Sequence, residues 1–229
     1  MDLNRQFNDR GPWVTRFDID GASYGGGFDA MRDPRIAQFF AAFPDVRSVL
    51  ELGSLEGGHS IALAARPTVE RVTAVEARRS NIEKAVFVKQ VVEDTKVEFI
   101  EMDVEKGDLA ALGRFDAVFC SGLLYHLPEP WDLVRKCADV SPRIFIWTQY
   151  ACEREARKLI NGYRGRWYKE GGRKDPLSGV SKWSYWLSLG SLVKLLTDCG
   201  YSETTIIHND LSHSNGCAVT LSATRRDSE

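Results

Sequence analysis

Two acidic residues and two glycines in the first half of the chain have the types and spacing that bind a nucleotide. Glu51 closes a short apolar run, Gly53 and Gly57 follow it, and Glu76 closes a second apolar run. Glycine lets the backbone pass close under a ligand, because it has no side chain to fill that space. An acid at the end of the second strand of a βαβ unit accepts hydrogen bonds from ribose hydroxyls. Residues 49–77 therefore predict a strand, a glycine turn, a helix, a second strand and a ribose-binding carboxylate.

The residues between the glycines narrow the type of nucleotide. A dinucleotide-binding loop carries G-x-G-x-x-G, whose middle glycine makes room for a pyrophosphate, and Leu55 stands at that position. The carboxylate of Glu51 disfavours a pyrophosphate and suits a ligand that carries an ammonium and a sulfonium group. No G-K-[ST] follows the turn, which excludes a Walker loop.

At these residues the chain resembles the class I S-adenosylmethionine-dependent methyltransferases. The first motif of that superfamily is usually (D/E)-x-G-x-G-x-G. Glu51, Gly53 and Gly57 match it, and Leu55 departs from it.

Later segments extend the resemblance in the same order along the chain. Residues 96–105 read as a third strand followed by Asp103, an acid that commonly faces the adenine amino group in the superfamily. Residues 115–130 read as a fourth strand that runs into a loop with Tyr-His-Leu before the prolines, and 142–150 fit the fifth strand. The resemblance covers roughly residues 46–150.

The resemblance implies an α/β, Rossmann-like fold with a mostly parallel seven-stranded sheet and a C-terminal antiparallel hairpin. Ligands in open parallel sheets bind at the carboxyl ends of the strands. The expected contacts to S-adenosyl-L-methionine, and to S-adenosyl-L-homocysteine as product, are Glu51, Gly53, Ser54, Gly57, Glu76, Ala77, Asp103, Val104, Ser121 and Gly122.

His126 follows the fourth strand, where the resemblance places the transferred methyl group. The unperturbed pKa of histidine is near neutrality, which suits a general base, although many members of the superfamily carry a histidine here in a mainly structural role. No metal is expected. The expected acceptor-binding residues are Tyr125, Trp167, Trp186, His208, Asp210 and His213, for the last three of which a polar surface turn is the alternative.

The chain divides into an amino-terminal cap of helix and loop (1–45) and a methyltransferase domain (46–229). An insertion at about 152–182 carries nine Lys or Arg against four acids, with interleaved aromatics. We expect this segment to be a lid over an acidic, phosphorylated or sugar-like acceptor, because large aromatic side chains in a mobile loop usually cover something apolar. A solvated charged loop is the alternative.

Composition excludes several classes of protein. The 229 residues have a formal net charge of −2 and 43% hydrophobic residues, which give no global electrostatic reason to bind nucleic acid or a membrane. No apolar run approaches a transmembrane helix or a signal core. The five cysteines are scattered, which predicts neither zinc nor a disulfide framework and indicates thiols in a reducing cytoplasm.

The predicted function is therefore an S-adenosylmethionine-dependent methyltransferase that acts on an oxygen of a small-molecule acceptor, a sugar or natural product. One alternative is a tRNA-modifying methyl or carboxymethyl transferase, because 121–134 and 182–201 look similar to the wobble-uridine carboxymethyltransferases. The chain lacks the basic character of that family. A second alternative is a noncatalytic protein that binds the cofactor and pairs with an active partner. The sequence does not specify the oligomeric state.

Overall fold

The computed structural model describes residues 2–225, which form two compact units, Met1–Met102 and Asp103–Glu229. The main sheet has seven strands in the order β12-β13-β8-β7-β4-β5-β6. The predicted fold class, an α/β fold with a mostly parallel sheet and a C-terminal antiparallel hairpin, is confirmed. Its strands are β4 (Ser48–Leu52), β5 (Arg71–Glu76), β6 (Val97–Glu101), β7 (Ala117–Ser121), β8 (Arg143–Gln149), β12 (Glu203–Asp210) and β13 (Ala218–Thr224).

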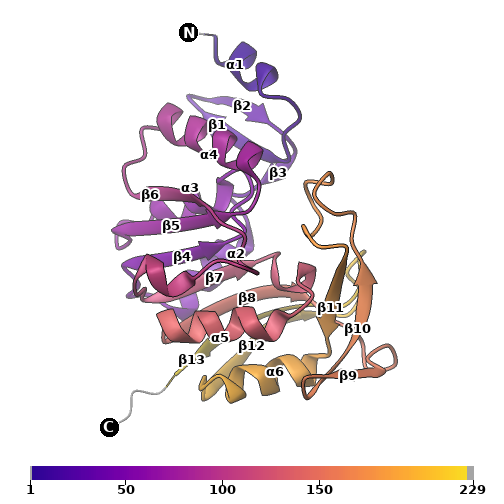
Figure 1. Ribbon diagram of the computed structural model, residues 1–229. Helices are drawn as coiled ribbons and strands as arrows, with labels where there is room; N and C mark the ends of the chain where they lie inside the picture. The colour runs from indigo at the N-terminus through magenta and orange to yellow at the C-terminus, as the bar shows by residue number, and fades with distance from the viewer. Residues whose placement is uncertain (1, 226–229) are drawn as a thin grey trace. The chain divides into compact units, whose positions relative to one another are not determined.

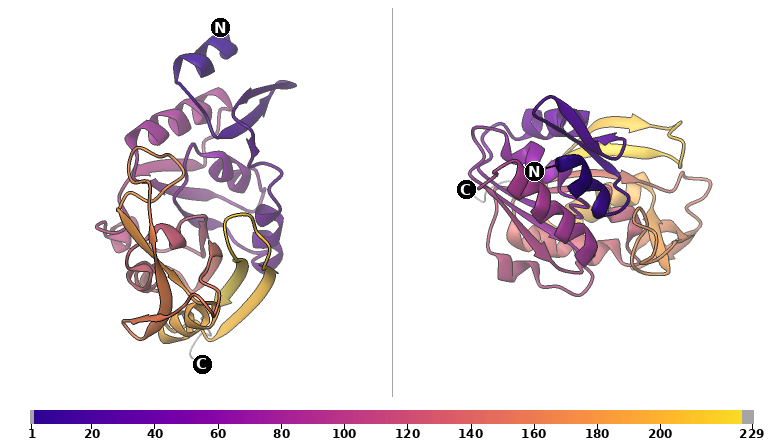
Figure 2. Two further views of the ribbon diagram at one scale, coloured as in Figure 1. Left: turned by 90° about the vertical axis from the view of Figure 1, so that its right-hand side faces the viewer. Right: turned by 90° about the horizontal axis from the view of Figure 1, so that it is seen from above.

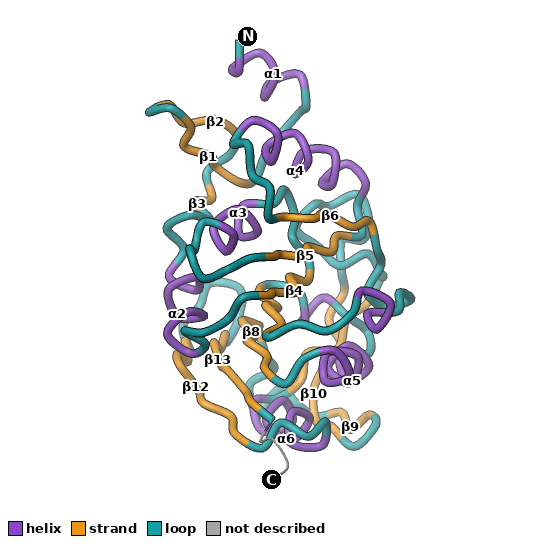
Figure 3. The backbone as a smooth tube through the Cα atoms, turned by 90° about the vertical axis from the view of Figure 1, so that its left-hand side faces the viewer, coloured by secondary structure: helices purple, strands orange, loops and turns teal. Residues whose placement is uncertain are grey.

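The first unit is built on the parallel strands β4, β5 and β6. Helices α2 (Pro34–Ala42), α3 (Gly58–Ala64) and α4 (Arg79–Val91) lie on the same side of these strands (Figure 3). Asp33 caps α2 by accepting a hydrogen bond from the backbone N–H of Arg35, and Pro34 opens the helix. This layout brings the ends of β4 and β5 to one edge of the unit, because parallel strands end together.

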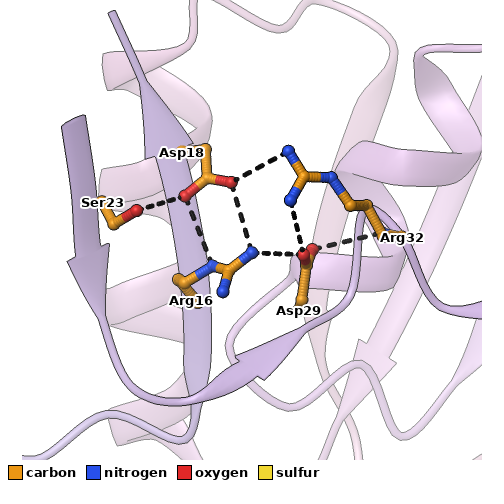
Figure 4. Close-up of polar contacts among 5 residues, drawn as sticks. All are labelled: Arg16, Asp18, Ser23, Asp29 and Arg32. Carbon is orange, nitrogen blue, oxygen red and sulfur yellow. Dashed lines mark hydrogen bonds and ion pairs between the residues drawn. The ribbon is translucent and has the colours of Figure 1, made fainter. Parts of the chain in front are cut away.

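The amino-terminal segment contains strands as well as the expected helix and loop. Helix α1 (Leu3–Asp9) precedes a small sheet of β1 (Thr15–Ile19), β2 (Ala22–Gly25) and β3 (Phe28–Asp29). A network of charged and polar side chains crosses this sheet (Figure 4). Arg16 pairs with Asp18 and Asp29, Arg32 pairs with the same two acids, and Ser23 donates to Asp18 at 2.6 Å. The alternation of buried and exposed residues that marks β1 covers only five residues, too few for a clear strand pattern.

In the second unit, β7 runs parallel to β8, and β8, β13 and β12 pair antiparallel in turn. Helices α5 (Pro130–Val140) and α6 (Leu189–Asp198) lie on one face of these strands (Figure 1). The unit also contains two short 3-10 helices, η1 (Leu109–Leu112) and η2 (Leu124–His126). Figure 2 shows the yellow β12–β13 hairpin from two directions. Within residues 2–225, no helix is both long and apolar enough to cross a membrane.

The basic and aromatic insertion contributes two strands to a small antiparallel sheet, whose third strand directly follows the insertion. Strands β9 (Lys158–Ile160) and β10 (Tyr163–Lys169) pair with each other, and β10 pairs with β11 (Trp183–Leu187). Asn161 and Gly162 join β9 to β10 with φ values of 52° and 84°. Positive φ at both central residues is typical of the tight turns that suit the twist of a hairpin. Residues 158–160 and 163–169 of the insertion are therefore regular sheet.

Two of the five cysteines are joined. Cys152 and Cys217 form a disulfide, whereas Cys120, Cys137 and Cys199 are free. The expectation that the scattered cysteines would all be free thiols is thus wrong for this pair. Sequence spacing could not reveal the pairing, because 65 residues separate the two cysteines and only the fold brings them together.

Candidate active site

The glycine turn after β4 has the backbone geometry that its glycines predict. Gly53 and Gly57 have φ values of 75° and 83°, and α3 begins at the next residue, Gly58. A Cβ atom at Gly57 would lie 2.7 Å from the ring of Phe99, so a side chain there would force the ring or the turn to move. Leu55 also takes a left-handed conformation, with φ of 51°. This backbone conformation costs an L-residue about 1–2 kcal/mol in conformational energy.

Glu51 at the end of β4 is a buried acid, with 2% of the residue exposed. Ser60 donates a hydrogen bond to its Oε2. Burial, with a contribution from the nearby charge of Glu76, raises the pKa of Glu51 to about 7. A carboxyl group held out of water beside a second acid favours a cationic partner.

Glu76 at the end of β5 is 6% exposed and joins this strand to the glycine turn. Its Oε2 accepts from the backbone N–H of Leu55 at 3.1 Å, and its Oε1 accepts from that of Arg78 at 2.8 Å. Burial raises the pKa of Glu76 despite these hydrogen bonds. The acid predicted to bind ribose also shapes the turn.

His126, in η2 just after β7, is held by a glutamate from the insertion. Its Nδ1 lies 3.0 Å from Oε2 of Glu170, and the His126 side chain is 15% exposed. Gly179 of the insertion packs closely against the backbone of His126. A Cβ atom added at Gly179 would lie 2.5 Å from the carbonyl oxygen of His126. Nothing in the sequence pattern pointed to Glu170, which stands among charged residues of a predicted loop.

Four of the predicted acceptor-binding and catalytic residues gather in one aromatic cluster in the second unit. The ring of Tyr125 lies 4.1 Å from that of His126 and 5.9 Å from each of the rings of Trp147 and Trp186. His213 joins the cluster through Trp147, at 5.7 Å between ring centroids. Trp186 is 2% exposed, and its Nε1 has no hydrogen-bond partner among the described residues. A buried indole N–H of this kind is a donor that a ligand can satisfy.

Comparison with known proteins identifies the relatives of this arrangement. Residues 50–142 match the family model of a methyltransferase domain. The N-terminal domain of EvdMO1, solved in the presence of SAH and D-fucose, is 35% identical to the chain with a TM-score of 0.89, and the match covers 99% of this chain and 98% of that one. The chain belongs to the class I S-adenosylmethionine-dependent methyltransferases.

Two further solved structures resemble the chain less closely. The structure of EvdMO1 is matched at 32% identity and a TM-score of 0.78, over 98% of this chain and 47% of that one. Magnesium protoporphyrin IX methyltransferase from Synechocystis PCC 6803, solved with bound SAM, is 18% identical with a TM-score of 0.57, over 85% and 77% of the two chains, and shows the shared fold alone. No curated protein sequence matches the chain.

The residues of the first unit fit the cofactor of this superfamily. Ser54 in the glycine turn is buried, and its Oγ has no hydrogen-bond partner among the described residues. Glu51 and Glu76 are acids whose pKa values are raised by burial, so a ligand with an ammonium group and ribose hydroxyls would favour their ionised forms. Ala77 follows Glu76 directly and is half-buried.

The methyltransferase motif residues of the second unit lie in two loops. Asp103 accepts from the backbone N–H of Glu105 at 3.1 Å, and Val104 is buried with its carbonyl oxygen 2.9 Å from Nζ of Lys136. Ser121 ends β7 in register with Trp147 of β8. Gly122 has φ of 85° and donates to the carbonyl oxygen of Trp147 at 3.0 Å. The loop after β7 is therefore fixed against the strand that carries one ring of the aromatic cluster.

The structure separates three other predicted acceptor residues from this cluster. Trp167 is 42% exposed and packs its ring against Tyr185, at 5.2 Å. His208 is exposed on β12, and Asp210 accepts from Ser212 beside the hairpin turn. These three stay predictions, without a contact to Tyr125 or Trp186 to support them.

The sequence reasoning missed Glu56, a buried acid inside the glycine turn. Its Oε2 accepts from the backbone N–H groups of Val14 and Thr15 at 2.9 and 2.8 Å, and its Oε1 accepts from Lys84 at 2.8 Å. Glu56 thereby ties the turn to strand β1. The only sequence signal was an acid between two motif glycines, which has no meaning until β1 is known to lie beside it.

His59 likewise contacts an acidic side chain of the protein. Its Nε2 lies 2.9 Å from Oδ2 of Asp33, the residue that caps α2. Burial lowers the pKa of His59. The histidine therefore links α3 to the start of α2.

Proposed function

We propose that this methyltransferase transfers a methyl group to a hydroxyl oxygen of a small, sugar-like acceptor, with His126 as the general base. The observation that carries the proposal is the junction of His126 with the cluster of Tyr125, Trp147 and Trp186. His126, a proton acceptor that follows β7, therefore lies in a cluster with aromatic faces and with the indole N–H of Trp186, which has no hydrogen-bond partner among the described residues.

The chemistry needs little from the protein beyond binding, alignment and proton removal. When bound, S-adenosylmethionine supplies a methyl group on a sulfonium sulfur, whose C–S bond breaks as a C–O bond forms to the acceptor. Glu51, Ser54 and Glu76 would hold this cofactor in the first unit, and the contacts expected from Asp103, Val104, Ser121 and Gly122 stay predictions. His126 accepts the hydroxyl proton, since an alcohol is a weak nucleophile while it keeps that proton.

The nature of the cluster favours a sugar-like acceptor. Aromatic faces pack against the C–H faces of a ring, and an indole N–H donates to a hydroxyl. The N-terminal domain of EvdMO1 was solved in the presence of D-fucose, which supports the same class of acceptor by similarity. The aromatic residues also support a role for the 152–182 insertion in enclosing the acceptor, because Tyr168 of this insertion stacks on Trp186 at 4.7 Å.

A thermal shift experiment tests the cofactor and an activity panel tests the acceptor. S-adenosylhomocysteine at about 100 times its dissociation constant should stabilise the protein by about 2.7 kcal/mol. A shift with NADH in place of S-adenosylhomocysteine would contradict the assignment. The panel comprises D-fucose, its methyl glycosides, related 6-deoxyhexoses and unmodified tRNA, with release of S-adenosylhomocysteine as the readout.

We expect transfer to a sugar hydroxyl, lost in His126→Ala. The variant Trp186→Phe should raise the acceptor KM with less effect on kcat, because it keeps one aromatic ring and removes the N–H donor together with the five-membered ring that carries it. Methylation of tRNA with no turnover of any sugar would overturn the proposed acceptor class. Full activity of His126→Ala would overturn the proposed base.

A further inference from the structure

Glu170 is a buried carboxylate surrounded by hydrogen-bond donors. Its side chain is 1% exposed. Oε2 accepts from Ser178 Oγ and from the backbone N–H of Gly179 at 2.8 Å, and Oε1 accepts from Ser184 Oγ at 2.6 Å. Nδ1 of His126, at 3.0 Å from Oε2, completes the set. Three of these four donors therefore converge on Oε2, and one binds Oε1.

The charge of Glu170 is held without a lysine or arginine. Burial alone would raise its pKa, but the hydrogen bonds from His126, Ser178, Ser184 and Gly179 lower the pKa to about 2. Among residues 2–225, His126 is the only basic side chain within ion-pair distance of this carboxylate. Among residues 2–225, the ionised acid therefore has a histidine as its basic partner and no lysine or arginine.

This geometry fixes which nitrogen of His126 can act as a base. An ionised carboxylate only accepts hydrogen bonds, so Nδ1 must carry the proton that it shares with Glu170. The lone pair of the neutral ring is then on Nε2. When Nε2 takes up a proton, the positive charge forms beside the buried carboxylate, which stabilises the imidazolium.

We infer that Glu170 is the positioning residue of His126: it fixes the Nδ1–H form of the ring and raises the affinity of Nε2 for a proton. The inference deepens the proposed function and rests on it for the role of His126 as base. It also gives the 152–182 insertion a second task, since the segment that carries Glu170 supplies the group that orients the base. A purely structural tie would need the hydrogen bond but would not depend on the charge.

Titration of His126 by NMR separates these roles without any acceptor. In protein labelled with ¹⁵N-histidine, the neutral ring of His126 should show the Nδ1–H tautomer. The pKa of His126 should fall by about one unit or more in Glu170→Gln, equivalent to about 1.4 kcal/mol per unit, because the amide keeps the shape and loses the charge. Glu105→Gln is the matched control, since Glu105 is also bound by a serine of the insertion, Ser181, at 2.9 Å.

The expected result is a shifted titration of His126 in Glu170→Gln and an unshifted one in Glu105→Gln. The acid limb of kcat/KM should move by the same amount, and the affinity for S-adenosylhomocysteine should not change. An Nε2–H tautomer in the wild-type protein, or an unchanged pKa in a folded Glu170→Gln, would overturn the inference. The tautomer measurement stands even where the variant fails to fold.

Failure of the inference and failure of the proposed function give different results. If the titration shifts as expected but no acceptor hydroxyl is methylated, the proposed acceptor chemistry is wrong and the role of Glu170 toward His126 holds. If a sugar is methylated and His126→Ala abolishes the activity, but Glu170→Gln leaves both the titration and the pH profile unchanged, only the positioning role is wrong.

Discussion

The backbone N–H of Leu55 donates a hydrogen bond of 3.1 Å to Oε2 of Glu76. One carboxylate at the end of β5 thereby supports the turn that follows β4, at the residue where a leucine occupies a left-handed conformation. The sequence predicts only one role for Glu76, the binding of a ribose. In the structure it links the ends of two strands that we propose to bind the cofactor, so a change at Glu76 should act on the shape of the turn as well as on the ligand.

Glu76→Ala should weaken the binding of S-adenosylhomocysteine by about 2 kcal/mol, because it removes charge-assisted hydrogen bonds to the ribose hydroxyls. It should also lower the free energy of unfolding by about 1 kcal/mol, since the N–H groups of Leu55 and Arg78 lose their acceptor. Glu76→Gln keeps an acceptor oxygen and should cost less stability. Calorimetry and urea unfolding measure the two effects. Unchanged affinity in Glu76→Ala would show that the acid does not contact the ligand.

The raised pKa of Glu51 predicts that cofactor binding depends on pH. Burial holds this pKa at about 7 in the free protein, whereas a ligand ammonium group favours the carboxylate. Binding below pH 7 must therefore release a proton, and the affinity should fall with decreasing pH, by up to about tenfold per unit. Calorimetry in buffers of different ionisation enthalpy counts that proton.

The same shift has a consequence for stability. The folded-state pKa of Glu51 lies above the unfolded value of about 4.3, so the folded protein binds the proton more tightly. The contribution of Glu51 to the free energy of unfolding of the free protein should be greatest below about pH 4. It should decrease as the pH rises from about 4 to about 7. Glu51→Gln should remove both the loss of stability and the proton release. Glu98→Gln, at an exposed residue of β6, should keep both. Ligand binding without proton release in the wild-type protein would contradict the assignment.

The sequence predicted the main sheet because each strand carries its own signal. Apolar runs that end in Glu51, Glu76 or Ser121 mark buried parallel strands, and β4 with β5, like β7 with β8, are neighbours both along the chain and in the sheet. The β9–β10 hairpin also had a local signal, Asn161-Gly162, which is the strongest short-range mark of a tight turn. It was not recognised within a segment rich in charges and glycines.

The contacts that build the candidate site had no such signal. Tyr125 comes from η2 and Trp186 comes from β11, and only long-range packing brings the two rings together. The same holds for Glu170, whose partners include Ser184 and His126, and only the fold reveals that this acid is buried. The predicted closure of the 152–182 insertion over an acceptor stays a prediction.

Gly57→Ala should destabilise the protein through two separate effects. The φ of 83° costs any L-residue about 1–2 kcal/mol, and a Cβ would meet the ring of Phe99 at 2.7 Å and the Cβ of Ala85 at 3.0 Å. Gly162→Ala is the control for the first effect, since its φ is 84° and nothing lies within 4 Å. Urea unfolding should show a loss in Gly57→Ala that exceeds the control by about 1–3 kcal/mol. Equal losses would mean that the turn relaxes away from Phe99.

The disulfide between Cys152 and Cys217 predicts a measurable difference between the oxidised and reduced protein. The oxidised chain, unfolded without reductant, should show three reactive thiols, those of Cys120, Cys137 and Cys199. Removing a link across 65 residues frees the unfolded chain, so Cys152→Ser combined with Cys217→Ser should lower the free energy of unfolding by about 2–5 kcal/mol. The control is the wild-type protein with reductant, which should lose a similar amount. Five reactive thiols in the oxidised protein would show that the pair does not form. A double variant as stable as the oxidised wild type would show instead that the surrounding strands, and not the covalent link, hold the start of the insertion against β13.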